Sequence, residues 1–182
     1  MPTTARRYTV DEVLAFPADG NRYELVQGEL LVTPAPSWRH QALVGLLFHR
    51  LQTYLAPHAD RAMVVLSPAD IVWAQDELVQ PDVFVVPAGE VSRDWSTIES
   101  LLLAVEVVSP GSVTADRVTK RRLYQKRGVA TYWAVEQEAP LVEVWRPEDD
   151  RPEIVTEELR WRVAPEAEEL AIDLGELFAK LP

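Results

Sequence analysis

The sequence predicts a single α/β domain in which a mixed β-sheet is flanked by helices. The chain has 182 residues, 47% of them hydrophobic and 26% charged, which is an ordinary globular balance and enough chain for one full core. The run 101–108 is almost wholly apolar, as in a strand buried on both faces. A helical segment and a second apolar run, 129–136, follow it, and this order indicates a right-handed βαβ crossover.

The N-terminal part is expected to contain a short helix and then a β-hairpin. Thr9 and Glu12 have the spacing of a capping box, and a proline ends the helix that they open. Residues 22–26 and 29–32 have strand length and flank a Gln-Gly turn, which is the pattern of a hairpin.

A long helix and three strands are expected next. Ser37 can cap the helix, leucines at helical spacing continue it to about Leu55, and Pro57 stops it. Short runs that are rich in β-branched residues and bounded by proline or polar residues then predict strands. These runs are 62–66, 70–73 and 82–86.

The second half of the chain continues the sheet. A Ser-Pro-Gly sequence breaks the strand 101–108, Thr114 or Ser112 can cap a helix to about Arg127, and Gly128 suits the position after its end. The remaining elements are expected as strands at 129–136, at 141–146 and near 154–163, and as a last helix near 174–181.

Charge is distributed unevenly along the chain. The net charge is −11, and residues 136–182 carry 14 acidic and only 5 basic side chains. We therefore expect one domain over 1–182, with an acidic C-terminal extension from about residue 147. The segment 117–127 is basic and is the one stretch suited to a phosphate backbone, although the overall charge argues against broad adhesion to nucleic acid.

Several kinds of site are excluded or lose support. The chain has no cysteine and no phosphate-loop, dinucleotide-binding, zincin or serine-hydrolase motif. It has no apolar run near the roughly 18 residues that span a bilayer and no signal-peptide core, so a cytoplasmic location is expected. His40, His49 and His58 recur every nine residues, which turns successive side chains by about 180° on a helix, so they cannot share one metal ion.

Glu106 is the most informative residue, because it interrupts the apolar run 101–108. An isolated buried carboxylate is costly, so Glu106 needs a partner. Glu106 lies three residues before the end of the strand, and Lys120 lies about as far along the returning helix, so the ammonium of Lys120 can approach the carboxylate. The alternative interpretations are a structural ion pair or a solvated sheet face for Glu106, and a solvated basic helix face for Lys120.

Asp82 gains meaning together with Glu106 and Lys120. Alone, an aspartate after Pro81 at the start of a strand is a common turn residue. Two carboxylates and a lysine, however, are the minimal set for divalent-metal hydrolysis of a phosphodiester, with Mg²⁺ or Mn²⁺ on the hard oxygens and the ammonium offsetting charge on phosphate.

The sequence resembles the Uma-two family of endonucleases, which belongs to the PD-(D/E)xK nuclease superfamily with a restriction-endonuclease-like fold. The resemblance covers Tyr8 to Arg146 and is most specific from Glu106 to Trp133. Four parts of the sequence carry the resemblance. The first three are Tyr-Glu-Leu-Val-Gln-Gly-Glu at the hairpin, His40 after a proline-rich turn, and Pro81-Asp82-Val83. The fourth is a long block made of Val105-Glu106-Val107-Val108-Ser109-Pro110, Asp116, Lys120, Tyr124, Gly128-Val129 and Tyr132-Trp133.

This resemblance implies a function and a site. Asp82 and Glu106 correspond to the metal-binding carboxylates, joined by a main-chain carbonyl near Val107, and Lys120 stands in for the motif lysine, whose place is taken by Val108. Glu24 is expected to extend the metal shell and His40 to reach the same cleft. Gln27 departs from the family, where an Asp is common. The expected partners are nucleic acid, foremost DNA, and a second copy of the chain in a homodimer.

Two further interpretations of the sequence compete with an active nuclease. One is an inactive nuclease-fold binding module associated with a mobile-element or defence system, which the charge of −11 favours. The other is a structural oligomer, whose interface would use tryptophans in predicted strands, namely Trp73, Trp133, Trp145 and Trp161.

Overall fold

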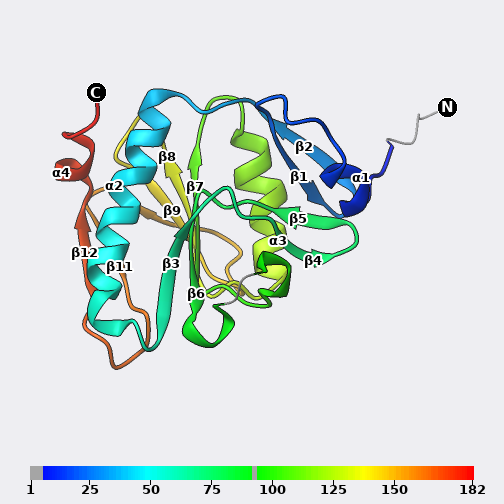
Figure 1. The fold of residues 1–182 in the computed structure, drawn as a ribbon. Coiled ribbons are helices and arrows are strands. Elements are labelled where there is room, and N and C mark those ends of the chain that lie inside the picture. The colour runs from blue at the N-terminus through cyan, green and yellow to red at the C-terminus, as the bar shows by residue number, and fades with distance from the viewer. Residues whose placement is uncertain (1–5, 92–93) are drawn as a thin grey trace.

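The computed structural model describes residues 6–91 and 94–182 and confirms a single mixed α/β domain (Figure 1). Its centre is a six-stranded sheet in the order β10-β9-β8-β7-β6-β3. These strands are β3 (Ala62–Leu66), β6 (Val83–Pro87), β7 (Leu103–Val108), β8 (Tyr132–Glu136), β9 (Val142–Trp145) and β10 (Glu153–Val155). The apolar strand β7 has all six residues buried and lies in the middle of this sheet, as predicted.

The chain crosses between β7 and β8, which pair in parallel. The crossover carries a π-helix, η4 (Ala115–Lys120), which continues into α3 (Arg121–Lys126). Gly128 follows with a φ of +68°, in the left-handed region that favours glycine after a helix. The other described pairings in this sheet are antiparallel, so the crossover is what makes the sheet mixed.

Two hydrophobic layers cover the two faces of the sheet. The long helix α2 (Trp38–Leu55), capped by Ser37 as predicted, packs Leu43, Leu47 and Leu51 against the face that carries Val105 and Trp133. The crossover helix covers the opposite face, where Leu123 and Tyr124 meet Phe84, Ala104 and Tyr132. Since side chains alternate along a strand, Glu106 faces the crossover helix with Ala104 and Val108.

A second sheet flanks the crossover helix, in the order β2-β1-β5-β4 (Figure 1). The predicted hairpin forms its β1 (Arg22–Val26) and β2 (Glu29–Thr33), after the capped helix α1 (Val10–Leu14). Its other strands are β4 (Ile71–Ala74) and β5 (Glu77–Val79).

The acidic C-terminal part completes the core. It forms β10, a two-stranded sheet of β11 (Glu158–Trp161) and β12 (Leu170–Asp173), and the helix α4 (Leu174–Phe178). Leu159, Trp161 and Ile172 join the same core cluster as α2. The segment beyond residue 147 therefore packs against the rest of the domain through apolar side chains despite its charge.

Several details differ from the sequence-based expectation. The strand β5 was not predicted, and the strand expected near 154–163 is two strands, β10 and β11, in different sheets. Neither suggested cap residue closes the crossover helix, because Thr114 makes no capping hydrogen bond and the Ser112 hydroxyl bonds Ser109. The remaining short helices are η1 (Ala56–His58), η2 (Ala88–Glu90) and η3 (Trp95–Thr97). No described helix is both long and apolar enough to cross a membrane.

Candidate active site

Asp82 and Glu106 are neighbours on adjacent strands. Val83 pairs with Val105 in the antiparallel β6–β7 ladder, so Asp82 stands opposite Glu106, and residues in such positions share one face of the sheet. The N–H of Val107 donates a 2.9 Å hydrogen bond to Asp82 Oδ2. Both carboxylates are buried. The structure thus brings together the two residues that the sequence singled out.

Lys120 extends from the crossover helix and makes the contact with Glu106 that the sequence predicted. Its Nζ lies 3.0 Å from Glu106 Oε1. It also lies 2.9 Å from Glu24 Oε2 and 3.0 Å from Asp116 Oδ1. The side chain of Lys120 is only 1% exposed. The interpretation of Lys120 as part of a solvated basic face is therefore wrong: it is the buried counter-ion of three carboxylates.

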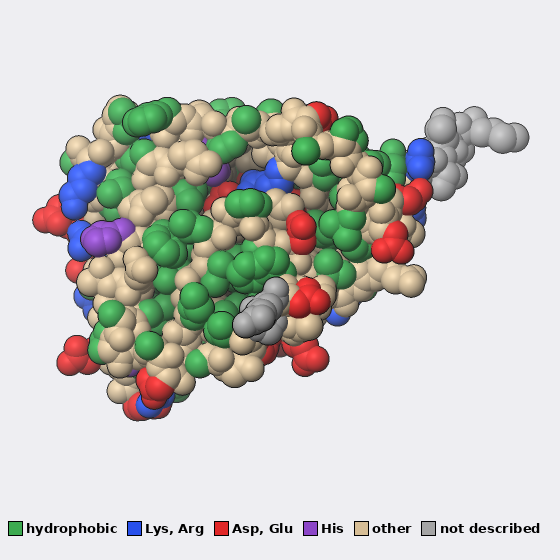
Figure 2. All heavy atoms as spheres, viewed as in Figure 1, with side chains coloured by type: hydrophobic (Ala, Val, Ile, Leu, Met, Phe, Trp, Pro, Cys, Tyr) green, Lys and Arg blue, Asp and Glu red, His purple; other side chains and the backbone are tan. Residues whose placement is uncertain are grey.

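Glu24 and His40 both reach the same cluster. Glu24, on β1, accepts a 2.8 Å hydrogen bond from the N–H of Gln80 on its second oxygen. His40, in the first turn of α2, places Nε2 3.2 Å from Asp82 Oδ2. Figure 2 shows a recess between α2 and the β1–β2 hairpin in which basic, acidic and histidine side chains gather. His49 and His58 lie elsewhere on α2 and η1, so the three histidines do not converge.

Three residues that were given no role from the sequence complete the cluster. Arg22 Nη1 bonds Asp82 Oδ1 at 2.7 Å, Tyr124 Oη donates to Glu106 Oε1 at 2.7 Å, and Asp116 contacts Lys120. Local spacing could have found them. Arg22 precedes Glu24 by two residues, hence on the same side of the strand, and Asp116 and Tyr124 lie four residues before and after Lys120, on the same side of the helix.

The cluster carries an excess of negative charge. Four buried carboxylates face two permanent cations, Arg22 and Lys120, which leaves two negative charges in excess when all four are ionised. The carboxylates are Glu24, Asp82, Glu106 and Asp116. An excess of two charges in a buried site is what one divalent cation would neutralise.

Their surroundings shift the pKa values of the two central carboxylates, Glu106 and Asp82, in opposite directions. Burial raises the pKa of Glu106 well above its ordinary value, and the charges of Asp82, Asp116 and Glu24 add to this, while Lys120 opposes it. Burial also works to raise the pKa of Asp82, but the His40 hydrogen bond and the charge of Arg22 outweigh burial and hold that pKa below its usual range. Lys120 itself stays protonated, because its three carboxylates overcome burial and raise its pKa.

The donor set fits a small hard cation. Glu106 Oε2 is buried and has no hydrogen-bond partner among the described residues, so it is a carboxylate oxygen available to a ligand. Mg²⁺ is commonly bound by one or two carboxylates and keeps several waters, which matches Asp82 and Glu106. Within residues 6–91 and 94–182, no group of three or more acidic or histidine side chains has the arrangement of a metal cage. The contact seen for Val107 uses its N–H, whereas the sequence-based expectation concerned its carbonyl.

The basic segment 117–127 is largely neutralised in the structure. Arg117 pairs with Glu136 and Glu143, and Lys126 and Arg127 both pair with the buried Glu77. Arg121 stacks over the ring of Trp145 at 4.6 Å. Arg122 is the exposed base of this segment that has no ion pair with a described residue. The segment therefore offers far fewer free cations than its sequence suggests.

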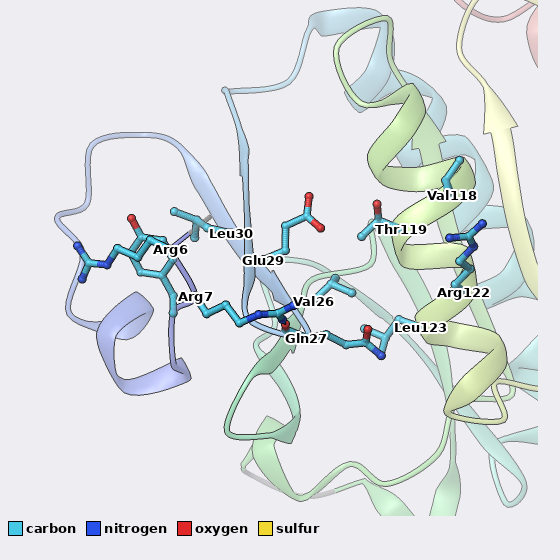
Figure 3. Close-up of a pocket in the computed structure, with 11 residues that line it drawn as sticks. Arg6, Arg7, Val26, Gln27, Glu29, Leu30, Val118, Thr119, Arg122 and Leu123 are labelled. Atoms are coloured by element: carbon cyan, nitrogen blue, oxygen red, sulfur yellow. The ribbon is translucent and has the colours of Figure 1, made fainter. Parts of the chain in front are cut away.

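A groove of about 650 Å³ lies beside the buried cluster, between the β1–β2 hairpin and the crossover helix (Figure 3). Gln27 and Glu29 line it on one side, and Val118 and Thr119 on the other. Figure 3 shows Arg7 reaching the hairpin turn, where it donates to the carbonyl of Gln27. No predicted site residue lines this groove. The groove and the carboxylate cluster are therefore separate features, although the hairpin and the crossover helix contribute residues to both.

Comparisons with known proteins agree with this fold. A family model described as "Putative restriction endonuclease", Uma2, matches residues 10–175. A crystal structure described as that of a putative nuclease from Anabaena variabilis is similar over 94% of this chain and 97% of that chain, with a TM-score of 0.77 and 23% sequence identity. No curated protein matches the chain.

Proposed function

The chain belongs to the Uma2 family, and on that premise we propose that it is a metal-dependent endonuclease that hydrolyses phosphodiester bonds in DNA. The observation that carries the proposal is the pair of buried carboxylates, Asp82 and Glu106, with one free oxygen and an excess of negative charge around it. Such an arrangement is poorly stable without a cation.

Each residue of the cluster has a different role in the proposed function. Asp82 and Glu106 would hold Mg²⁺ or Mn²⁺. A divalent ion held by these residues would polarise a phosphate and lower the pKa of bound water. Asp82 is kept ionised and fixed by Arg22, by His40 and by the N–H of Val107. Tyr124 and Lys120 occupy Oε1 of Glu106, which leaves Oε2 free for the ion.

Calorimetry with Mn²⁺ and a cleavage assay on mixed DNA substrates test this proposal together. Wild type should bind Mn²⁺ and cleave DNA only when the metal is added. The Asp82→Ala/Glu106→Ala variant should lose both, since it lacks both carboxylate ligands. Arg151→Ala, in an exposed loop, is the matched control and should behave as wild type. Equal Mn²⁺ uptake by wild type and the double variant would show that the site is wrong.

The inactive binding module remains the second candidate, because Lys120 is enclosed by carboxylates and is not aimed at open space. DNA binding without cleavage in Mg²⁺ or Mn²⁺ would favour it. We also propose that the protein is cytoplasmic and forms a homodimer, as expected from the sequence. Light scattering of the purified chain tests the homodimer.

A further inference from the structure

The cation that contacts the substrate phosphate must have an unused donor and access to solvent. Lys120 has neither. An ammonium has three N–H donors, and Lys120 has three carboxylate oxygens at 2.9–3.0 Å around it. To reach a phosphate, Lys120 would have to leave a buried ion pair, which is costly.

Arg22 differs from Lys120 in both respects. Its side chain is 22% exposed, the largest exposure among the charged side chains of the cluster. A guanidinium has five N–H donors in a fixed plane. Nη1 donates to Asp82 Oδ1 at 2.7 Å and to the carbonyl of Gln80 at 3.2 Å, while Nε lies 3.8 Å from Glu24 Oε2, beyond hydrogen-bond range.

The other terminal nitrogen of Arg22, Nη2, has N–H donors that no described residue uses. Within the described part of the chain, Nη2 makes no hydrogen bond with a protein group, whereas Nη1 makes two. Because the same guanidinium is held against Asp82, a phosphate that approaches the two central carboxylates also approaches Nη2. Arginine suits this contact, since its planar donors match phosphate oxygens.

We infer that Arg22 is the phosphate-contacting residue of this site and that Lys120 is a positioning residue that holds Glu24 and Glu106. The inference rests on the proposed function for its substrate class, a phosphodiester. It reverses the assignment made from the sequence, which gave the phosphate contact to Lys120. It also explains why one side of the Arg22 guanidinium is satisfied by protein and the other is not.

The test uses a ligand with a single phosphate, so that no cleavage position needs to be known. The ligand is the dinucleotide dTpdT, and its comparison is the methylphosphonate analogue, in which the same linkage is uncharged. Binding of each is followed by NMR titration in Ca²⁺ for wild type, Arg22→Ala and Arg22→Lys. Mn²⁺ affinity is measured separately by calorimetry, and Arg151→Ala serves as the control.

Wild type should prefer dTpdT over the analogue by about tenfold or more, the ratio expected of one charge-assisted hydrogen bond. Arg22→Ala should lose most of this preference but far less Mn²⁺ affinity than Asp82→Ala/Glu106→Ala loses, because both proposed metal ligands remain. Arg22→Lys should recover only part of the preference, because a point charge replaces a planar pair of donors.

Two results overturn the inference. One is an Arg22→Ala variant that keeps the full preference, or a wild type that has none. The other is an Arg22→Ala variant that loses Mn²⁺ affinity in step with the preference, which would make Arg22 only a holder of Asp82. Absence of DNA cleavage by wild type is a different failure, because it removes the proposed function while the dinucleotide titration still decides which residue contacts phosphate.

Discussion

Lys120 is stabilised by its surroundings and in turn stabilises them. Three carboxylates contact its ammonium inside the protein, where a carboxylate without a partner is costly. A lysine in this position is expected to contribute more to folding than a surface lysine does, because its removal leaves several buried charges with one counter-ion fewer.

We therefore expect Lys120→Ala to lower the free energy of unfolding by about 3–5 kcal/mol, the usual cost of removing one partner of a buried ion pair. Urea unfolding followed by tryptophan fluorescence measures it. Lys180→Ala, at an exposed position, is the control and should stay within about 0.5 kcal/mol of wild type. A Lys120→Ala variant as stable as the control would contradict a charged cluster.

Glu106 links metal binding to pH. Its pKa is raised well above the ordinary value, first by burial and then by neighbouring carboxylates. A folded-state pKa above the unfolded one means that Glu106 favours folding fully below its unfolded pKa, and that this contribution is lost as the pH rises through the folded-state pKa. A metal ion competes with the proton, because carboxylate ligands must be ionised.

Mn²⁺ affinity should consequently rise with pH between the ordinary and the raised pKa of Glu106, with release of up to about one proton per ion. Calorimetry in two buffers of different ionisation enthalpy measures how many protons are released for each Mn²⁺ ion bound. Glu106→Gln should bind Mn²⁺ weakly and without this proton release. The same proton release in the variant would assign it to another group.

At the scale of elements, strong local signals were sufficient for much of the fold. The Ser37 cap with leucines at helical spacing gave α2, and the Gln-Gly turn gave the β1–β2 hairpin. The three residues of β5 are too few to give such a signal, although they pair with β4 across a two-residue turn at 75–76. Only the pairing of β5 with β1 joins residues far apart in the chain. The tail divides into β10 and β11 at residues 156–157, where no glycine or proline marks the break.

The candidate site was predictable to a similar degree. Strand and helix lengths placed Lys120 near Glu106, and the structure shows that contact. They could not show that Glu24 also contacts Lys120, because that depends on how the hairpin packs against the crossover helix. For the same reason the sequence could not rank Arg22 above Lys120 in access to solvent.

The crossover helix sets an expectation for salt dependence. Its bases Arg117, Lys126 and Arg127 are paired with glutamates, so Arg121 and Arg122 are the ones left to displace counter-ions from DNA. With Arg22 added, the logarithm of the binding constant should fall with the logarithm of salt concentration at a slope of about −2 to −3.

Fluorescence anisotropy of a labelled duplex over a range of salt concentrations gives this slope. Arg121→Ala/Arg122→Ala should make it shallower by up to about 2, whereas Arg151→Ala should leave it unchanged. A wild-type slope near −10 would require a contact surface much larger than these residues supply.

At the scale of the whole molecule, the acidic C-terminal part and the candidate site lie on opposite faces of the central sheet. The net charge is −11, yet the acidic C-terminal part lies on the α2 side of the sheet through Leu159, Trp161 and Ile172, whereas the crossover helix and the hairpin cover the other face. The excess acidic charge of the tail is thereby carried by elements other than those that build the candidate site.

The cluster is assembled from distant stretches of chain, from Arg22 on the hairpin to Lys120 on the crossover helix, and Asp82 meets Glu106 only through the β6–β7 pairing. Pairings between distant residues close slowly, because the entropy of the intervening loop must be lost before their contacts form. A chain that is still folding has its carboxylates apart and no place for a metal ion. On the proposed function, hydrolysis begins only when folding is complete, so a growing or partly unfolded chain is harmless to the DNA around it.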